Sequence, residues 1–135
     1  MMNDSRYDAL DFYIEQNSRY QRESYRVAAR GLSLYLDEVA QAFDINDLSS
    51  SGCSLRTPAE LLTVGRIFSG DLHIGNTRYL TDLKLKIVRH IADSNTAGVF
   101  LDLNRRQTFM LDKLLLEIQK RSIMIHAALG KKGKH

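Results

Sequence analysis

The sequence predicts a mainly β domain with flanking helices, built as a small antiparallel barrel of about six strands. Two observations support this prediction. Between residues 30 and 103, short runs of alternating apolar and polar residues recur, with turn signals about every 8–12 residues. The last part of the chain instead carries apolar residues at helical spacing. A length of 135 residues, 44% of them apolar, suits one domain with a real hydrophobic core.

The chain opens with the pattern of a helix over roughly residues 5–18. Asn3, Asp4 or Ser5 can cap it, and an apolar stripe follows at helical spacing. Residues 18–26 then form a polar linker rich in arginine and tyrosine. We expect this N-terminal extension, residues 1–19, to precede the barrel domain.

Alternating residues place the strands one after another. The expected strands are 32–36, 42–46, 52–55, 67–74 with a bulge near Ser69-Gly70, 79–91, and 97–103. Gly75-Asn76 has the form of a two-residue hairpin turn. Thr57-Pro58-Ala59-Glu60 resembles a capping box, which predicts a single helical turn through Leu62. In the long run, Ile91 is expected on the same inward face as Tyr79.

A helix is expected from about Arg105 to Leu129, with one apolar stripe to cover the barrel. That stripe comprises Leu111, Leu114, Leu115, Ile118, Ser122, Ile125 and Leu129. A second, thinner stripe lies opposite and comprises Phe109, Leu116, Ile123 and Ala127. It packs either on the N-terminal helix or on a partner chain, so a homodimer through this helix is one prediction. The domain is expected to span residues 20–130, followed by a basic tail, 131–135.

Two polar clusters carry the chemistry of a binding site. Arg22 and Arg26 lie four residues apart, and Asp47-Leu48-Ser49-Ser50-Ser51-Gly52 follows about twenty residues on. The arginine fork matches phosphate oxygens or the O6/N7 edge of guanine. Asp47 can accept from the N–H edge of guanine, and Ser49 and the amides around Gly52 can donate to phosphate. Either cluster alone is ordinary for exposed charges or for a turn.

At these residues the chain resembles the PilZ domain family, marked by Arg-x-x-x-Arg followed by Asp/Asn-x-Ser-x-x-Gly. The resemblance covers roughly residues 20 to 122. It implies a six-stranded barrel with a C-terminal helix and a receptor for cyclic di-GMP. The ligand-binding residues it implies are Arg22, Arg26, Asp47, Ser49 and Gly52, with Gln21, Ser50 and Ser51 as secondary contacts. One departure is Leu101, which stands three residues after Gly98, where the family often has phenylalanine.

The resemblance therefore implies a sensor or adaptor, which changes conformation on binding cyclic di-GMP. Its output would be a protein partner in motility, attachment or exopolysaccharide production. The alternative is a degenerate module of the same fold that binds a protein and no nucleotide. A further alternative is nucleic-acid binding through Arg105, Arg106, Lys120, Arg121 and the tail lysines. We do not expect it, because few strand aromatics accompany these basic residues.

Nothing in the sequence predicts an enzyme, a cofactor or a metal site. His73, His90, His126 and His135 lack metal-ligand spacing, and no nucleophile or nucleotide-binding fingerprint occurs. The single cysteine, Cys53, excludes an intrachain disulfide and is expected to pack as a small apolar residue. No apolar run approaches the ~20 residues that cross a bilayer, and the N-terminus lacks a signal-peptide core. A cytoplasmic protein is the expectation.

Overall fold

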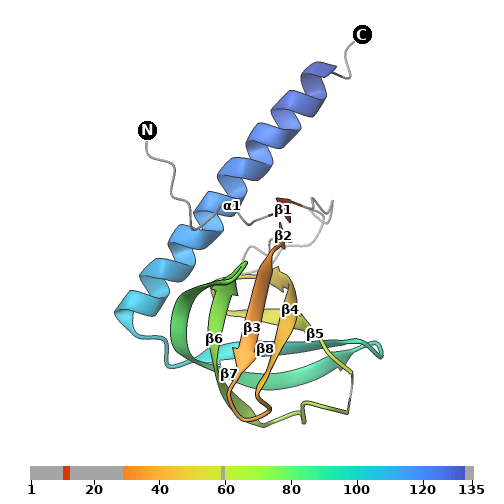
Figure 1. The fold of residues 1–135 in the computed structure, drawn as a ribbon, viewed down its shortest axis with the longest axis vertical. Coiled ribbons are helices and arrows are strands. Elements are labelled where there is room, and N and C mark those ends of the chain that lie inside the picture. Colours follow the sequence, from red (N-terminus) through yellow and green to blue (C-terminus); the bar gives the residue numbers. More distant parts are fainter. Residues whose placement is uncertain (1–10, 13–28, 59, 133–135) are drawn as a thin grey trace.

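The structure is a computed structural model that describes the backbone of residues 11–12, 29–58 and 60–132 and the side chains of residues 30–58 and 60–121. Six antiparallel strands close a barrel in the order β3-β4-β5-β8-β7-β6 (Figure 1). Their bounds are β3 Leu32–Leu36, β4 Gln41–Leu48, β5 Gly52–Arg56, β6 Ile67–Ile74, β7 Thr77–Ile91 and β8 Asn95–Leu101. The predicted fold class is confirmed.

Two further elements lie at one end of the barrel. Helix α1, Arg105–Lys132, crosses that end and continues past it (Figure 1). A short ladder pairs β1, Asp11–Phe12, with β2, Ala29–Arg30. In this ladder β1 lies near α1 and β2 lies near β4. The prediction of a helix over residues 5–18 is therefore wrong at Asp11–Phe12, which form a strand. The other residues of that predicted helix lie outside the described part of the chain.

The core follows from the alternation along each strand. Leu32, Leu34 and Leu36 of β3 are buried, while Ser33 and Tyr35 between them are half-buried. The helix contributes Leu111, Leu114 and Ile118 to the same buried cluster as the barrel strands. This inward face confirms the described part of the predicted core stripe. Burying each such leucine or isoleucine stabilises the fold by about 1.5–3 kcal/mol, so α1 is held to the barrel mainly by apolar packing.

Two local predictions about strand pairing are confirmed. Ile74 pairs with Thr77, so Gly75-Asn76 forms the two-residue turn between β6 and β7. The β6–β7 register shifts between Gly70 and Leu72, close to the expected bulge. In contrast, β8 spans Asn95–Leu101 rather than 97–103, because Asn95 and Thr96 already pair with β5 and β7.

Two other predictions are wrong. In place of the predicted helical turn there is one hydrogen-bonded turn, in which the Leu61 N–H donates to the Pro58 carbonyl at 3.2 Å, and the described residues between 57 and 62 form no helix. The Thr57 hydroxyl lies 2.7 Å from that of Thr96. Thr57 thus bonds across to the strand β8 instead of capping a helix. Ile91 is 36% exposed rather than inward-facing. A bulge between Ile87 and Arg89 reverses the alternation at this end of β7.

The start of α1 is tied down by a reciprocal cap. The backbone N–H of Gln107 donates to Asn104 Oδ1 at 2.7 Å, and the backbone N–H of Asn104 donates to Gln107 Oε1 at 3.0 Å. This is a capping box with Asn104 as the N-cap. The helix is 28 residues long, about 42 Å at 1.5 Å per residue, so much of it projects beyond the barrel (Figure 1). No helix in the described part of the chain is both long and apolar enough to cross a membrane.

Candidate ligand-binding site

The serine-rich bend joins β4 to β5 and is held by a dense set of local hydrogen bonds. The Ser49 N–H donates to the Gly52 carbonyl at 2.9 Å. The Ser49 hydroxyl oxygen accepts from the N–H groups of Ser51 and Gly52, both at 3.2 Å. The Phe100 N–H donates to the Ser51 carbonyl at 2.8 Å, which fastens the bend to β8. The bend is therefore a preformed turn rather than an open loop.

Ser49 has a different environment from its two serine neighbours. Its side chain is fully buried, whereas Ser50 and Ser51 are exposed. The amides of Ser51 and Gly52 already donate to Ser49, and the Ser51 hydroxyl lies 3.1 Å from the Ser49 hydroxyl. The bend therefore presents the exposed side chains of Ser50 and Ser51, with Ser51 already bonded to Ser49. Ser49 shapes the bend, and this role is independent of any ligand.

Gly52 lies where β5 passes closest to β8. A Cβ at this position would lie 2.2 Å from the Gly98 carbonyl oxygen and 3.0 Å from Val99 Cα. Gly98 in turn leaves room for the Leu85 side chain, whose Cγ would lie 2.6 Å from an added Cβ. Glycine is thus required here for the close approach of two strands, in addition to any close approach by a ligand.

Asp47 is positioned by an irregularity near the end of β4. The β4–β5 register shifts between Ile45 and Asp47, and Asp47 then pairs with Ser54. Such a bulge changes the direction in which a side chain points. The Asp47 side chain is half-buried at this rim of the barrel.

Arg30 is a neighbour of this site that the sequence reading missed. Continuing the β3–β4 register beyond the pair Ser33↔Asp44 brings residue 30 level with Asp47, and β2 does lie beside β4. The Arg30 side chain is exposed. A signal was available, because Arg30 follows Arg26 at the same four-residue spacing that separates Arg22 from Arg26.

Arg22, Arg26 and Gln21 lie outside the described residues. The structure does fix the two points between which they are attached. Phe12 pairs with Ala29 in the β1–β2 ladder, so the chain leaves and re-enters the described fold at adjacent positions. One of these positions lies near α1 and the other near β4, the strand that leads into the bend.

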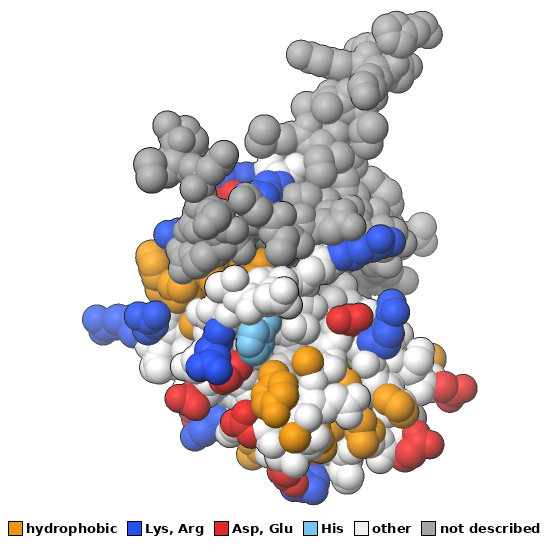
Figure 2. Space-filling model, in the orientation of Figure 1, with side chains coloured by type: hydrophobic (Ala, Val, Ile, Leu, Met, Phe, Trp, Pro, Cys, Tyr) orange, Lys and Arg blue, Asp and Glu red, His pale blue; other side chains and the backbone are white. Residues whose placement is uncertain are grey.

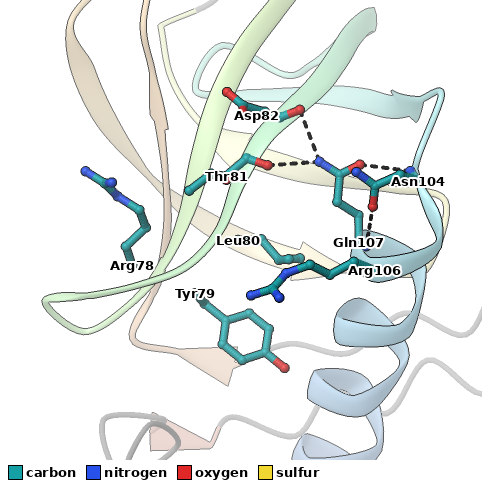
Figure 3. A pocket seen from close by; sticks show the side chains of 8 residues that line it. All are labelled: Arg78, Tyr79, Leu80, Thr81, Asp82, Asn104, Arg106 and Gln107. Atoms are coloured by element: carbon teal, nitrogen blue, oxygen red, sulfur yellow. Dashed lines mark hydrogen bonds between the residues drawn. The ribbon is translucent and has the colours of Figure 1, made fainter.

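A second polar place lies where β7 meets the start of α1 (Figure 3). It is a hollow of about 240 Å³, lined by Arg78–Asp82, Asn104, Arg106 and Gln107. The buried side-chain amide of Gln107 donates through Nε2 to the backbone carbonyl oxygens of Thr81 at 2.9 Å and Asp82 at 3.1 Å. The Tyr79 hydroxyl donates to the Met110 carbonyl at 2.8 Å. These bonds join the helix to the barrel, so this hollow is a structural junction between α1 and β7. The pattern Asn104-x-x-Gln107 is the sequence signal for the helix cap at this junction, and the sequence analysis did not use it.

Metal chemistry has no support among the described side chains. No group of three or more His, Cys, Asp or Glu residues in that part of the chain could hold an ion. Cys53 is buried, as expected for a small apolar strand residue.

A comparison of the sequence with models of protein families identifies the family of this chain. The PilZ domain model matches residues 16–117. The chain belongs to the PilZ domain family. The match spans both polar clusters and ends within α1. No match was found among curated proteins.

Solved structures share the PilZ fold at low sequence identity. The K. pneumonia MrkH–c-di-GMP complex superposes with a TM-score of 0.64 at 17% identity, over 78% of this chain and 55% of that one. YcgR from Escherichia coli in complex with c-di-GMP gives 0.63 at 16%, over 81% and 50%. The PilZ domain of the same YcgR with c-di-GMP gives 0.60 at 12%, over 80% and 98%. The chain thus spans about half the length of MrkH and of full YcgR.

Proposed function

We propose that this PilZ protein is a receptor for cyclic di-GMP. Family membership and the ordered pair of motifs support the proposal, and all three similar structures described above contain that ligand. The proposed ligand-binding residues are Arg22, Arg26, Asp47, Ser49 and Gly52, of which Ser49 and Gly52 act by shaping the bend. Gln21, Ser50, Ser51 and Arg30 are proposed as further contacts. The single observation that carries the proposal is the preformed bend at Asp47–Gly52 beside the point where the arginine-bearing segment re-enters the fold.

The chemistry assigns different parts of the ligand to different groups. The arginines face the two phosphates, or stack on or bond the guanine bases, because their flat, fork-shaped heads suit both. Asp47 accepts from the N–H edge of one guanine, an edge that adenine does not reproduce. Ser50 and Ser51 donate from the exposed side of the bend, while Ser49 keeps that side in shape.

The proposed response is closure of the arginine-bearing segment onto the bend. A ligand shifts a conformational equilibrium only as far as it binds one state better than the other. When the segment closes, the ligand contacts the residues of both motifs at once; before closure it can contact those of only one motif. Since β1 lies near α1 and is paired with β2, closure would also change the surroundings of the helix. We infer that α1 reports ligand binding to a protein partner in motility, attachment or exopolysaccharide production.

We propose that the partner-facing surface of α1 begins at Phe109, the first residue of the second stripe. This side chain is 62% exposed. A homodimer through α1 at Phe109 would cover it. Sedimentation of the wild type and of Phe109→Lys would test it: dimerisation predicts a higher mass for the wild type only, and a monomeric wild type at high concentration rejects it.

Calorimetric titration with cyclic di-GMP tests the receptor function. We expect saturable binding that weakens at least about tenfold, ~1.4 kcal/mol, in Arg22→Ala, Arg26→Ala and Asp47→Ala. Arg89→Ala is the matched control, because Arg89 is an exposed arginine on β7 outside the motifs. A folded wild type that takes up no ligand would reject the receptor and favour a degenerate module that binds only protein.

A further inference from the structure

A second hollow borders the serine-rich bend on the side of the helix. Its volume is about 310 Å³, and it is lined by Ser50 together with Asp112, Leu115, Leu116 and Gln119 of α1. Ser50 belongs to the bend, whereas the other four residues lie in the helix and outside both PilZ motifs. The hollow is thus a place where a molecule held at the bend would also touch α1.

The lining has the composition of a site for a planar, hydrogen-bonding base. Leu115 and Leu116 offer aliphatic surface, and Leu116 is 53% exposed, which is costly for a large apolar side chain in water. Asp112 and Gln119 lie two helical turns apart on the same face and border the leucines. The leucines suit the flat face of a base, and the two polar groups suit its edge.

The polar groups favour guanine over a phosphate. A carboxylate only accepts hydrogen bonds, and it repels an anion. Guanine presents adjacent N1–H and N2–H₂ donors, which one carboxylate can accept together, and O6 and N7 acceptors, which a carboxamide N–H₂ can meet. Asp112 and Gln119 therefore complement both edges of a guanine.

The size of the hollow points to part of the ligand rather than all of it. Pockets for whole small molecules span about 300–1,000 Å³, so 310 Å³ lies at the low end and suits a single base. Ser50 connects this hollow to the bend that carries Asp47 and Gly52. A cyclic dinucleotide with one guanine at Asp47 has a second guanine to place.

We propose that the hollow between Ser50 and α1 is a second guanine subsite, formed by Asp112, Gln119 and the two leucines. This inference rests on the proposed function, because it places the other half of the same ligand. It gives α1 a direct contact with the ligand, in addition to the route through β1. The helix then senses the base itself.

The test compares cyclic di-GMP with 3′,3′-cyclic GMP–AMP, in which adenine replaces one guanine, in binding to Asp112→Asn and Gln119→Ala. The wild type should prefer cyclic di-GMP by about tenfold, since adenine lacks the N1–H that Asp112 accepts. Asp112→Asn should weaken cyclic di-GMP binding by about tenfold and leave the mixed dinucleotide almost unchanged, so that the preference disappears. Gln119→Ala should reduce the preference in the same direction.

The control is Asp93→Asn, which removes an exposed carboxylate in the turn between β7 and β8. It should keep the wild-type preference.

Thermal unfolding of all variants checks the fold, and Gln119→Ala provides the second readout if Asp112→Asn unfolds. If the wild type binds cyclic di-GMP but Asp112→Asn and Gln119→Ala bind both dinucleotides as the wild type does, the subsite is wrong and the receptor stands. If the folded wild type binds neither, the receptor and the subsite both fail.

Discussion

At the scale of single residues, the motif positions of the bend also serve the fold. Ser49 is fully buried, and its hydroxyl accepts from two backbone amides and lies 3.3 Å from the Gly52 carbonyl oxygen. Gly52 allows β5 to lie against β8. A loss of ligand binding on mutating either residue can therefore come from a distorted bend. Stability has to be measured beside affinity.

Ser49→Ala should lower the free energy of unfolding by about 1–2 kcal/mol. The substitution leaves the amides of Ser51 and Gly52 without their acceptor, and unsatisfied buried groups cost about this much. Urea denaturation measures the change. Ser50→Ala, which removes an exposed hydroxyl from the same bend, should stay within about 0.5 kcal/mol of the wild type. Equal stability of both variants would contradict the structural role of Ser49.

Gly52→Ala should lower the free energy of unfolding by about 2–3 kcal/mol, because the added Cβ meets a backbone carbonyl that cannot move alone. Gly65→Ala is the comparison. Gly65 has open space around it but a φ of +92°, so alanine there costs only the backbone strain of about 1–2 kcal/mol. Denaturation of the two variants side by side would contradict this account if Gly65→Ala were clearly the more damaging.

At the scale of elements, the joint between β7 and α1 fixes where the helix leaves the barrel. Gln107 takes part in four hydrogen bonds there: two in the capping box and two to the carbonyl oxygens of Thr81 and Asp82. It is 6% exposed, and its removal leaves the Thr81 and Asp82 carbonyl oxygens without this donor. Gln107 therefore adds a polar anchor to the apolar packing that holds this 28-residue helix on the barrel.

Gln107→Ala should therefore destabilise the protein by about 2 kcal/mol, because the Asn104 N–H loses its side-chain acceptor and two carbonyl oxygens lose their side-chain donor. Thr108→Ala, at the next and exposed position, should cost no more than about 0.5 kcal/mol. Chemical denaturation followed by circular dichroism measures both. Near-identical midpoints for the two variants would show that apolar packing alone positions the helix.

At the scale of the whole molecule, the barrel and its long helix were predictable, because alternation and helical spacing record which side of each element is buried. The bulge in β6 was predicted too, but those in β4 and β7 were not. The shift between Ile87 and Arg89 exposes Ile91, and that between Ile45 and Asp47 positions a motif residue, yet each depends on pairing with a distant strand. The turns at 57–62 were missed for the same reason, since Thr57 bonds to Thr96 from another strand.

The residues of the candidate site likewise fall into those that the sequence predicted and those that it did not. The motif residues of the bend were predicted from the sequence, and the family match includes them. The helix residues Asp112 and Gln119 were not predicted, because only the folded chain brings them near the bend. Arg30 was not predicted either, although it repeats the four-residue spacing of Arg22 and Arg26. Among the basic residues of α1 that suggested nucleic acid, Arg121 is paired with Glu117 at 3.1 Å. On the barrel, Figure 2 shows Lys and Arg side chains interspersed with Asp and Glu side chains.

Residue-resolved NMR during titration with cyclic di-GMP tests the central claim most directly, because it reports both whether the ligand binds and where. Saturable shifts should concentrate on the amides of Asp47–Gly52, on Arg30 and on the α1 residues beside Ser50. The turn at Asp37–Ala40, at the opposite end of β3 and β4, should stay unchanged. A spectrum that does not change with excess ligand, or shifts confined to that opposite turn, would contradict a receptor site at the serine-rich bend.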